Sequence, residues 1–121
     1  MPQICIVVEY ETNEGAEEEF TALAMDHARR TLIEEPGCLR FDVTKPLDEN
    51  GRPIANAVML NEIFTDEAAF AAHGDNPRLA VLRNATAPLV KSRRRVVSNI
   101  VNGPAEETGM APDQLNASND G

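Results

Sequence analysis

The sequence predicts an α+β domain of the ferredoxin-like type, with the element order β-α-β-β-α-β, over residues 1–102 of the 121. Three observations support this prediction. Two long segments carry apolar residues at the 3.6-residue period of helices that cover a sheet. Four segments are β-branched or alternate between apolar and polar residues, as strands do. The order of these segments places both helices on one face of a four-stranded antiparallel sheet, because crossovers are right-handed.

The first strand is predicted at residues 4–10, ICIVVEY, which are apolar at nearly every position. A helix is predicted from about residue 14 to about residue 34, beginning with several Glu residues that favour a helix N-terminus. His27 lies on its apolar stripe. Pro36 and Gly37 end the helix, since proline lacks an amide donor and glycine can adopt the left-handed conformation of a helix C-terminus.

The second and third strands are predicted to form a hairpin around Asn50-Gly51. The second strand starts at Cys38, and its successive side chains point to opposite faces of the sheet. One set is predicted to face the helices and the other set to face away from them. The set predicted to face the helices is Leu39, Phe41 and Val43, and the opposite set is Cys38, Arg40 and Asp42. In the third strand, at about residues 55–64, one face is shared by Val58, Leu60, Glu62 and Phe64.

A second helix is predicted after Thr65 or Asp66, either of which is a good N-cap. His73 lies on its inner side, GDNP interrupts it, and it resumes until Pro88. The last strand is predicted at about residues 93–101. Because the first and last strands are interpreted as apolar on both faces, the sheet face without helices needs a cover, and a homodimer packed sheet against sheet is expected.

The composition narrows the classes of function. The net charge of −9 argues against nucleic acids and anionic membrane surfaces as partners. No apolar run is long enough to span a membrane, and the N-terminus lacks the features of a signal peptide, so a cytoplasmic protein with reduced Cys5 and Cys38 is expected. Residues 103–121 contain four acids and no base, and a flexible acidic tail is predicted there.

The candidate catalytic residues are the two histidines of the chain, His27 and His73, which are predicted to converge on the helix-covered face of the sheet. Imidazole titrates near neutral pH and serves as a general acid or base, although each histidine could instead be a core residue bonded to a backbone carbonyl. The sequence contains no Gly-rich phosphate loop, nucleophile elbow or Cys/His pair at metal-ligand spacing. No cofactor and no metal are therefore expected.

Other residues could form the walls of a substrate pocket. Phe41, Leu60 and Phe64 are apolar candidates. Glu62 is either a buried carboxylate that orients a histidine or a strand-end charge paired with an arginine, and we favour the second interpretation. The basic cluster Lys91–Arg95 is either a solvated strand start, which we favour, or a clamp for a phosphate or carboxylate.

Two motifs resemble those of the antibiotic biosynthesis monooxygenase superfamily, whose members include proteins described as quinol monooxygenases. The motifs are EEPGCLRFDV at residues 34–43, and LNEIFTDEAAFAAH at residues 60–73 with Pro77 following. The resemblance extends over about residues 3–102 and implies a dimeric α+β barrel with a pocket between helices and sheet. Some members oxygenate phenols or quinols with molecular oxygen and no cofactor. The chain also resembles the autoinducer-2 phosphate isomerase, which has histidines at the positions of His27 and His73.

Three hypotheses follow. In the first, the protein is a cofactor-free monooxygenase in which a histidine, preferably His73, takes a proton from a phenol or quinol that then reacts with oxygen. In the second, it is an isomerase in which both histidines move a proton within a small oxo compound whose phosphate is held by Lys91–Arg95. In the third, it is a non-catalytic dimer that binds a small molecule.

Overall fold

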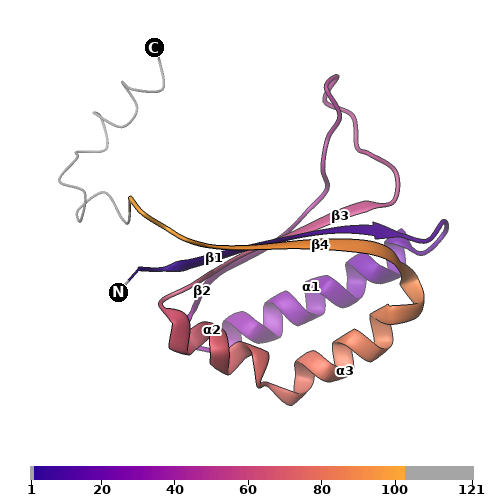
Figure 1. The fold of residues 1–121 in the computed structure, drawn as a ribbon. Coiled ribbons are helices and arrows are strands. Elements are labelled where there is room, and N and C mark those ends of the chain that lie inside the picture. The colour runs from indigo at the N-terminus through magenta and orange to yellow at the C-terminus, as the bar shows by residue number, and fades with distance from the viewer. Residues whose placement is uncertain (1, 103–121) are drawn as a thin grey trace, which may run out of the picture.

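The helices all lie on one face of a four-stranded antiparallel sheet in the computed structural model, which describes residues 2–102 (Figure 1). The strands are arranged in the order β2-β3-β1-β4, so the predicted ferredoxin-like topology is confirmed. The predicted flexible tail at residues 103–121 lies outside the described residues. The elements are β1 (Ile4–Thr12), α1 (Glu17–Glu34), β2 (Cys38–Thr44), β3 (Ala57–Phe64), α2 (Glu67–Gly74), α3 (Pro77–Thr86), the short 3-10 helix η1 (Ala87–Leu89) and β4 (Val90–Asn99).

The core lies between the sheet and the helices, and strict alternation builds the sheet side of it. Every second residue of β3, from Val58 to Phe64, is buried, and β1 contributes Ile4, Ile6 and Val8. α1 covers this surface with buried residues at helical spacing, Phe20, Ala24, His27, Ala28 and Thr31. Both histidines of the chain are buried on this side of the sheet.

The predicted second helix is two helices, because the GDNP segment ends one and starts the next. Asp66 caps α2, its carboxylate accepting a hydrogen bond from the amide of Ala69 at 2.8 Å. Asn76 caps α3 in the same way through the amide of Arg78 at 3.0 Å, and Pro77 occupies the first turn. None of the helices in residues 2–102 has the length and apolar character that crossing a membrane requires.

The predicted facing of the first residues of β2 is wrong. Cys38 is only 7% exposed and belongs to the core, whereas Leu39 is 48% exposed. The pairing of β2 with β3 shifts register between Cys38 and Arg40, and such an irregularity breaks the simple alternation of faces. Phe41 is buried as predicted, and Arg40 and Asp42 pair with each other at 2.6 Å in an exposed position.

The role predicted for Gly37 is also wrong. Among the described glycines only Gly15 and Gly51 have a positive φ, so Gly37 does not end α1 in the left-handed conformation. Its lack of a side chain serves a close approach instead, since a Cβ atom there would lie 2.4 Å from the Cβ of Ala69. The carbonyl of Gly37 also accepts a hydrogen bond from the amide of Thr65 at 2.9 Å, which holds the start of α2 against this turn.

The sheet face opposite the helices is uncovered in the single chain (Figure 1). Cys5, Val7 and Ile63 on this face are partly exposed, and Val96 of β4 is 44% exposed. The interpretation of the last strand as apolar on both faces is wrong for most of its length, because β4 starts at Val90 and includes Lys91 and Arg93–Arg95. The apolar part of the uncovered face therefore consists mainly of Cys5 and Val7 of β1, with Ile63 of β3 and Val96 of β4 beside them.

We expect Gly37→Ala to lower the free energy of unfolding by about 1–3 kcal/mol, because the new methyl group overpacks the contact with Ala69. Urea denaturation of both proteins measures this difference. Gly74→Ala is the matched control: its Cβ would meet no atom within 4 Å, and its effect should be neutral or stabilising by up to about 1 kcal/mol. Equal stability of Gly37→Ala and the unchanged protein would contradict the packing role of Gly37.

Candidate active site

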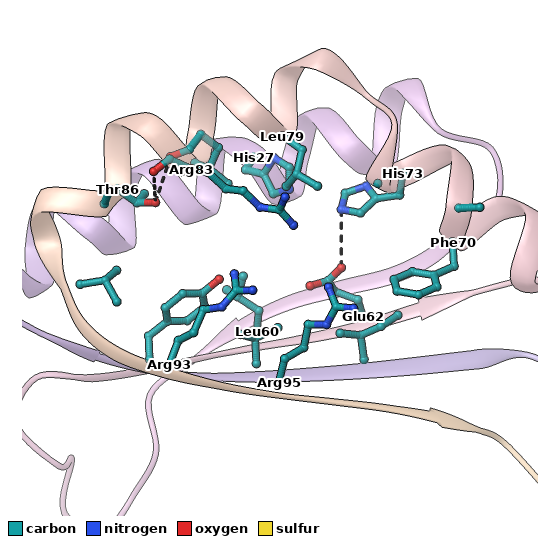
Figure 2. Close-up of a pocket in the computed structure, with 18 residues that line it drawn as sticks. His27, Leu60, Glu62, Phe70, His73, Leu79, Arg83, Thr86, Arg93 and Arg95 are labelled. Carbon is teal, nitrogen blue, oxygen red and sulfur yellow. Dashed lines mark hydrogen bonds and ion pairs between the residues drawn. The ribbon is translucent and has the colours of Figure 1, made fainter.

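A cavity of about 650 Å³ lies between the sheet and the helices α2 and α3 (Figure 2). Its volume is within the range of small-molecule sites. β1 and β3 form its floor, α2 and α3 its roof, and β4 one side. The polar residues in its lining are Tyr10, His27, Glu62, His73, Arg83, Thr86, Arg93 and Arg95, and the larger apolar ones are Ile6, Val8, Leu60, Phe70, Leu79, Leu82 and Val90.

His73 lies in the last turn of α2 and is 5% exposed. Its Nδ1 atom is 2.9 Å from Oε1 and 3.1 Å from Oε2 of Glu35. Since a carboxylate only accepts hydrogen bonds, Nδ1 carries the proton and donates it. In the neutral ring the Nε2 atom is then an acceptor that receives no hydrogen bond within residues 2–102, and it lies beside Glu62 in the cavity lining, 3.8 Å from Oε1 (Figure 2). This is the arrangement of an oriented general base.

His27 has the opposite arrangement. Nδ1 of His27 lies 2.7 Å from an Nη atom of Arg78, and a guanidinium can only donate. Nδ1 must therefore be the acceptor, which places the proton of the neutral ring on Nε2. Burial, and then the positive charge of Arg78, lowers the pKa of His27 from 6.5 to about 4. His27 is thus a neutral hydrogen-bond donor at physiological pH and a poor base.

Arg78 and Glu35 connect the two histidines. The guanidinium of Arg78 lies 3.3 Å from Oε2 of Glu35 and also donates to Oγ1 of Thr31 at 3.2 Å. The side-chain amide of Asn76 donates to the same Oε2 atom at 3.1 Å. The carboxylate of Glu35 therefore receives hydrogen bonds from α2 and α3 at once. Sequence reasoning did not identify Glu35 or Arg78 as site residues.

Glu62 is a buried carboxylate, 6% exposed, and not the strand-end charge that we favoured from the sequence. It forms no ion pair with an arginine in the part of the chain that the structure describes. Burial raises its pKa from 4.5 to about 7; Arg95 opposes this rise and Glu35 adds to it. Near neutral pH Glu62 therefore exchanges between its protonated and ionised forms beside the imidazole of His73.

The pocket residues predicted from the sequence divide into two groups. His27, His73, Leu60 and Glu62 line the cavity. Phe41 and Phe64 are buried in the core behind the histidines and are not part of the lining. Their rings pack against the imidazoles, with centroid distances of 5.4 Å between Phe41 and His27 and 5.1 Å between Phe64 and His73. They fix the position of the imidazoles instead of forming the wall.

Three arginines complete the lining, and all three are exposed to solvent. Arg93 and Arg95 belong to the cluster that we favoured as a solvated strand start, and their exposure agrees with that interpretation. Arg83 was not predicted as a pocket residue. The guanidinium of Arg95 lies 5.6 Å from the ring centroid of Phe70. Residues 2–102 contain no group of three or more His, Cys, Asp or Glu side chains placed to hold a metal ion.

The sequence of the chain matches the model of a known family. The family model described as "Antibiotic biosynthesis monooxygenase" matches residues 3–84, and the chain belongs to this family. The resemblance deduced from the two sequence motifs is thereby confirmed. A comparison with curated proteins finds no match.

Several solved structures share the fold. One is named "Putative antibiotic biosynthesis monooxygenase from Nitrosomonas europaea", with 20% identity, a TM-score of 0.73, and coverage of 84% of this chain and 92% of that one. Another is a Bacteroides thetaiotaomicron protein of unknown function named "Possible Oxidoreductase", with 18% identity, a TM-score of 0.72, and coverage of 82% and 98%. At these identities the likeness establishes the fold alone.

The raised pKa of Glu62 predicts a pH-dependent difference in stability. Between pH 4.5 and about 7 the folded protein keeps a proton on Glu62 that the unfolded chain has released. The stability that the protonated carboxyl group contributes is therefore complete below pH 4.5 and is lost as the pH rises through 7. Glu62→Gln cannot ionise. Its stability relative to the unchanged protein should therefore be greater at pH 8 than at pH 4, by on the order of 3 kcal/mol.

Urea denaturation of both proteins at the two pH values tests this expectation. The contribution of His27 to the pH dependence is common to both proteins and cancels in the comparison. Glu14→Gln, which removes an exposed carboxylate, is the control and should show no such difference. A stability difference between Glu62→Gln and the unchanged protein that stays constant from pH 4 to pH 8 would disprove the shifted pKa.

Proposed function

We propose that the protein is a cofactor-free monooxygenase that acts on a small phenolic or quinol-type substrate with molecular oxygen. The observation that carries this proposal is the Glu35–His73 pair, whose Nε2 atom is directed into a cavity with Ile6, Val8 and Leu60 on its floor. Membership of the antibiotic biosynthesis monooxygenase family supports the same reaction class.

His73 acts as the base in this proposal. Its Nε2 atom takes the proton of a substrate hydroxyl, and the imidazolium that forms is stabilised by the carboxylate of Glu35 at Nδ1. His27 cannot compete for that proton, because its pKa is about 4. Its Nε2–H group is instead suited to donate a hydrogen bond to the oxygen anion as negative charge develops. The two histidines therefore have different roles.

The substrate supplies all the electrons that the reaction needs. A deprotonated quinol is electron-rich enough to reduce oxygen, and the apolar residues Ile6, Val8 and Leu60 of the cavity floor limit competing reactions with water. One oxygen atom enters the ring and the other leaves as water, so that a quinol and molecular oxygen give a hydroxyquinone and water. This balance requires no external reductant.

A second candidate is an isomerase of a small phosphorylated oxo compound. The observation that favours it is the presence of Arg83, Arg93 and Arg95 in the lining, where they could hold a phosphate while a histidine moves a proton between carbons. The third candidate is a dimer that binds a small molecule without turnover. Oxygen consumption separates the first candidate from the other two.

We expect the protein to accelerate oxygen uptake with members of a quinol panel beyond their spontaneous oxidation, and to incorporate one atom of isotopically labelled oxygen into the product. His73→Gln should lower kcat by about 10²–10⁴-fold, because it removes the base. An oxygen electrode and mass spectrometry give both measurements. Asp75→Asn, an exposed change next to the end of α2, is the matched control and should retain full activity.

Three results would count against this proposal. Turnover of a phosphorylated oxo compound without oxygen uptake would establish the isomerase instead. Equal activity of His73→Gln and Asp75→Asn would show that His73 is not the base. Absence of any turnover, combined with tight binding of a small molecule, would favour the non-catalytic dimer.

The proposal includes a homodimer in which two copies pack their uncovered sheet faces against each other. The uncovered face carries the partly exposed side chains of Cys5, Val7, Ile63 and Val96, an apolar group that a second copy would bury. Arg40 and Asp42 lie on the same face and would belong to the interface. The cavity lies on the other face of the sheet and would remain open to substrate.

We expect the protein to elute as a dimer in size-exclusion chromatography with light scattering, and Val7→Arg to shift it to the monomer, because the guanidinium would be buried unpaired. Val81→Arg is the control, since Val81 is apolar and 67% exposed on α3. A protein that is monomeric at all concentrations would refute the dimer. So would a Val7→Arg variant that dimerises as well as Val81→Arg.

A further inference from the structure

We propose that Arg83, Arg93 and Arg95 form an anion subsite at the side of the cavity bordered by β4, and that the ligand of the cavity carries a carboxylate or phosphate group that binds there. The identification of this ligand as the substrate rests on the proposed function. The binding of the anion itself does not depend on turnover. Both the oxygenase and the isomerase could use such a subsite.

The charge distribution around the cavity is the first support. The whole chain has 20 acids, 11 Lys and Arg residues and a net charge of −9, yet the lining contains three arginines and a single carboxylate, Glu62. Even when Glu62 is ionised, the lining keeps a positive excess, because three guanidiniums outnumber the one carboxylate. His27 stays neutral at physiological pH and adds nothing to this excess. A positive cavity in an acidic protein attracts anions selectively.

The pairing of β4 with β1 is the second support. Arg93 lies opposite Tyr10 and Arg95 lies opposite Val8, and both of these β1 residues line the cavity. Arg94 lies opposite Glu9 on the other face and pairs with it at 3.9 Å, and Lys91 pairs with Glu11 at 3.6 Å. Within residues 2–102 no ion pair forms at Arg93 or Arg95, so the cavity-facing guanidiniums keep their capacity to bind a ligand.

The side chains converge from two elements. Figure 2 shows the guanidinium of Arg83 extending from α3 into the space above the sheet, while Arg93 and Arg95 extend from β4 toward it. Arg83 also forms no ion pair within the described residues. Guanidinium groups bind carboxylates and phosphates through two parallel hydrogen bonds, so arginines on two sides of one cavity provide a suitable cradle.

The electrostatic effect of these groups is visible at Tyr10, which lies on the cavity floor beside Arg93. Burial raises the pKa of the Tyr10 phenol, and Arg93 and Arg83 oppose that rise. The positive field of two of the arginines therefore reaches the same point on the floor. A ligand anion near the hydroxyl of Tyr10 would experience both charges at once.

Isothermal titration calorimetry on the full chain tests the subsite with three probes of similar shape. 4-Hydroxybenzoate carries a carboxylate, phenyl phosphate a phosphate, and 4-hydroxybenzamide is the neutral counterpart of the first. We expect at least one anionic probe to bind about tenfold or more tightly than the amide. The two anionic probes show which of the two groups the subsite prefers.

Charge-removing variants then locate the binding. Arg83→Gln and Arg93→Gln, on different elements, should each weaken the preferred anion by about tenfold or more and leave the affinity for the amide nearly unchanged. Arg94→Gln removes the same charge from the same strand on its other face and should have little effect. Thermal melts of each variant confirm folding, and because the two test positions are independent, one folded variant is sufficient.

The proposal is overturned if the amide binds as tightly as both anions, if neither anion binds at millimolar concentration, or if Arg94→Gln weakens the anion as much as Arg93→Gln does. Its failure is distinguishable from that of the proposed function. Oxygen uptake with neutral quinols, together with no preference for anions, would disprove the anion subsite and support the oxygenase. Arginine-dependent anion binding without oxygen uptake would support the anion subsite and disprove the oxygenase.

Discussion

The contact of Arg78 with Glu35 is the interaction on which the rest of the candidate site depends. It joins α3 to the end of α1, with 3.3 Å between the charged groups. Arg78 cannot accept a hydrogen bond or lose its proton, so its contact with His27 fixes which nitrogen of that ring is protonated. By stabilising the carboxylate of Glu35, it also lets Glu35 hold the Nδ1 proton of His73. One cation therefore sets opposite proton arrangements in the two imidazoles.

This division of roles follows from electrostatics at short range. His27 and His73 lie with ring centroids 5.4 Å apart, and two imidazolium ions at that distance would repel each other. Lowering the pKa of His27 removes the conflict, because His27 then stays neutral and, in the proposed mechanism, only His73 accepts a proton. Glu62 adds a carboxyl group whose pKa burial raises to about 7, so that it is partly protonated near neutral pH. A buried ionisable group with no ion-pair partner among the arginines reduces stability above its pKa, and such losses are typical of functional sites.

Local patterns were sufficient to predict the elements and the positions of both histidines, because periodicity decides which side of a helix or strand is buried. His27, His73 and Glu62 could be assigned to one face of the sheet on that basis. The contact of Arg78 with His27 joins residues separated by 51 positions, and no local pattern contains that information. The exposure of Leu39 was missed for a different reason: a register irregularity in β2 breaks the alternation on which the prediction was based.

The sequence shows Lys91–Arg95 only as one basic cluster. The register of β4 on β1 divides this cluster between the two faces of the sheet. Side chains of a strand alternate strictly, so Arg93 and Arg95 share a face while Arg94 is on the other. A slip of one residue would move both cavity arginines to the uncovered face and bring Arg94 into the cavity. The pairing of Arg94 with Glu9 on the uncovered face is an exposed contact at 3.9 Å and contributes little to the register. The backbone ladder between β1 and β4, from Ile4 opposite Asn99 to Glu11 opposite Ser92, therefore determines which charges lie inside the cavity.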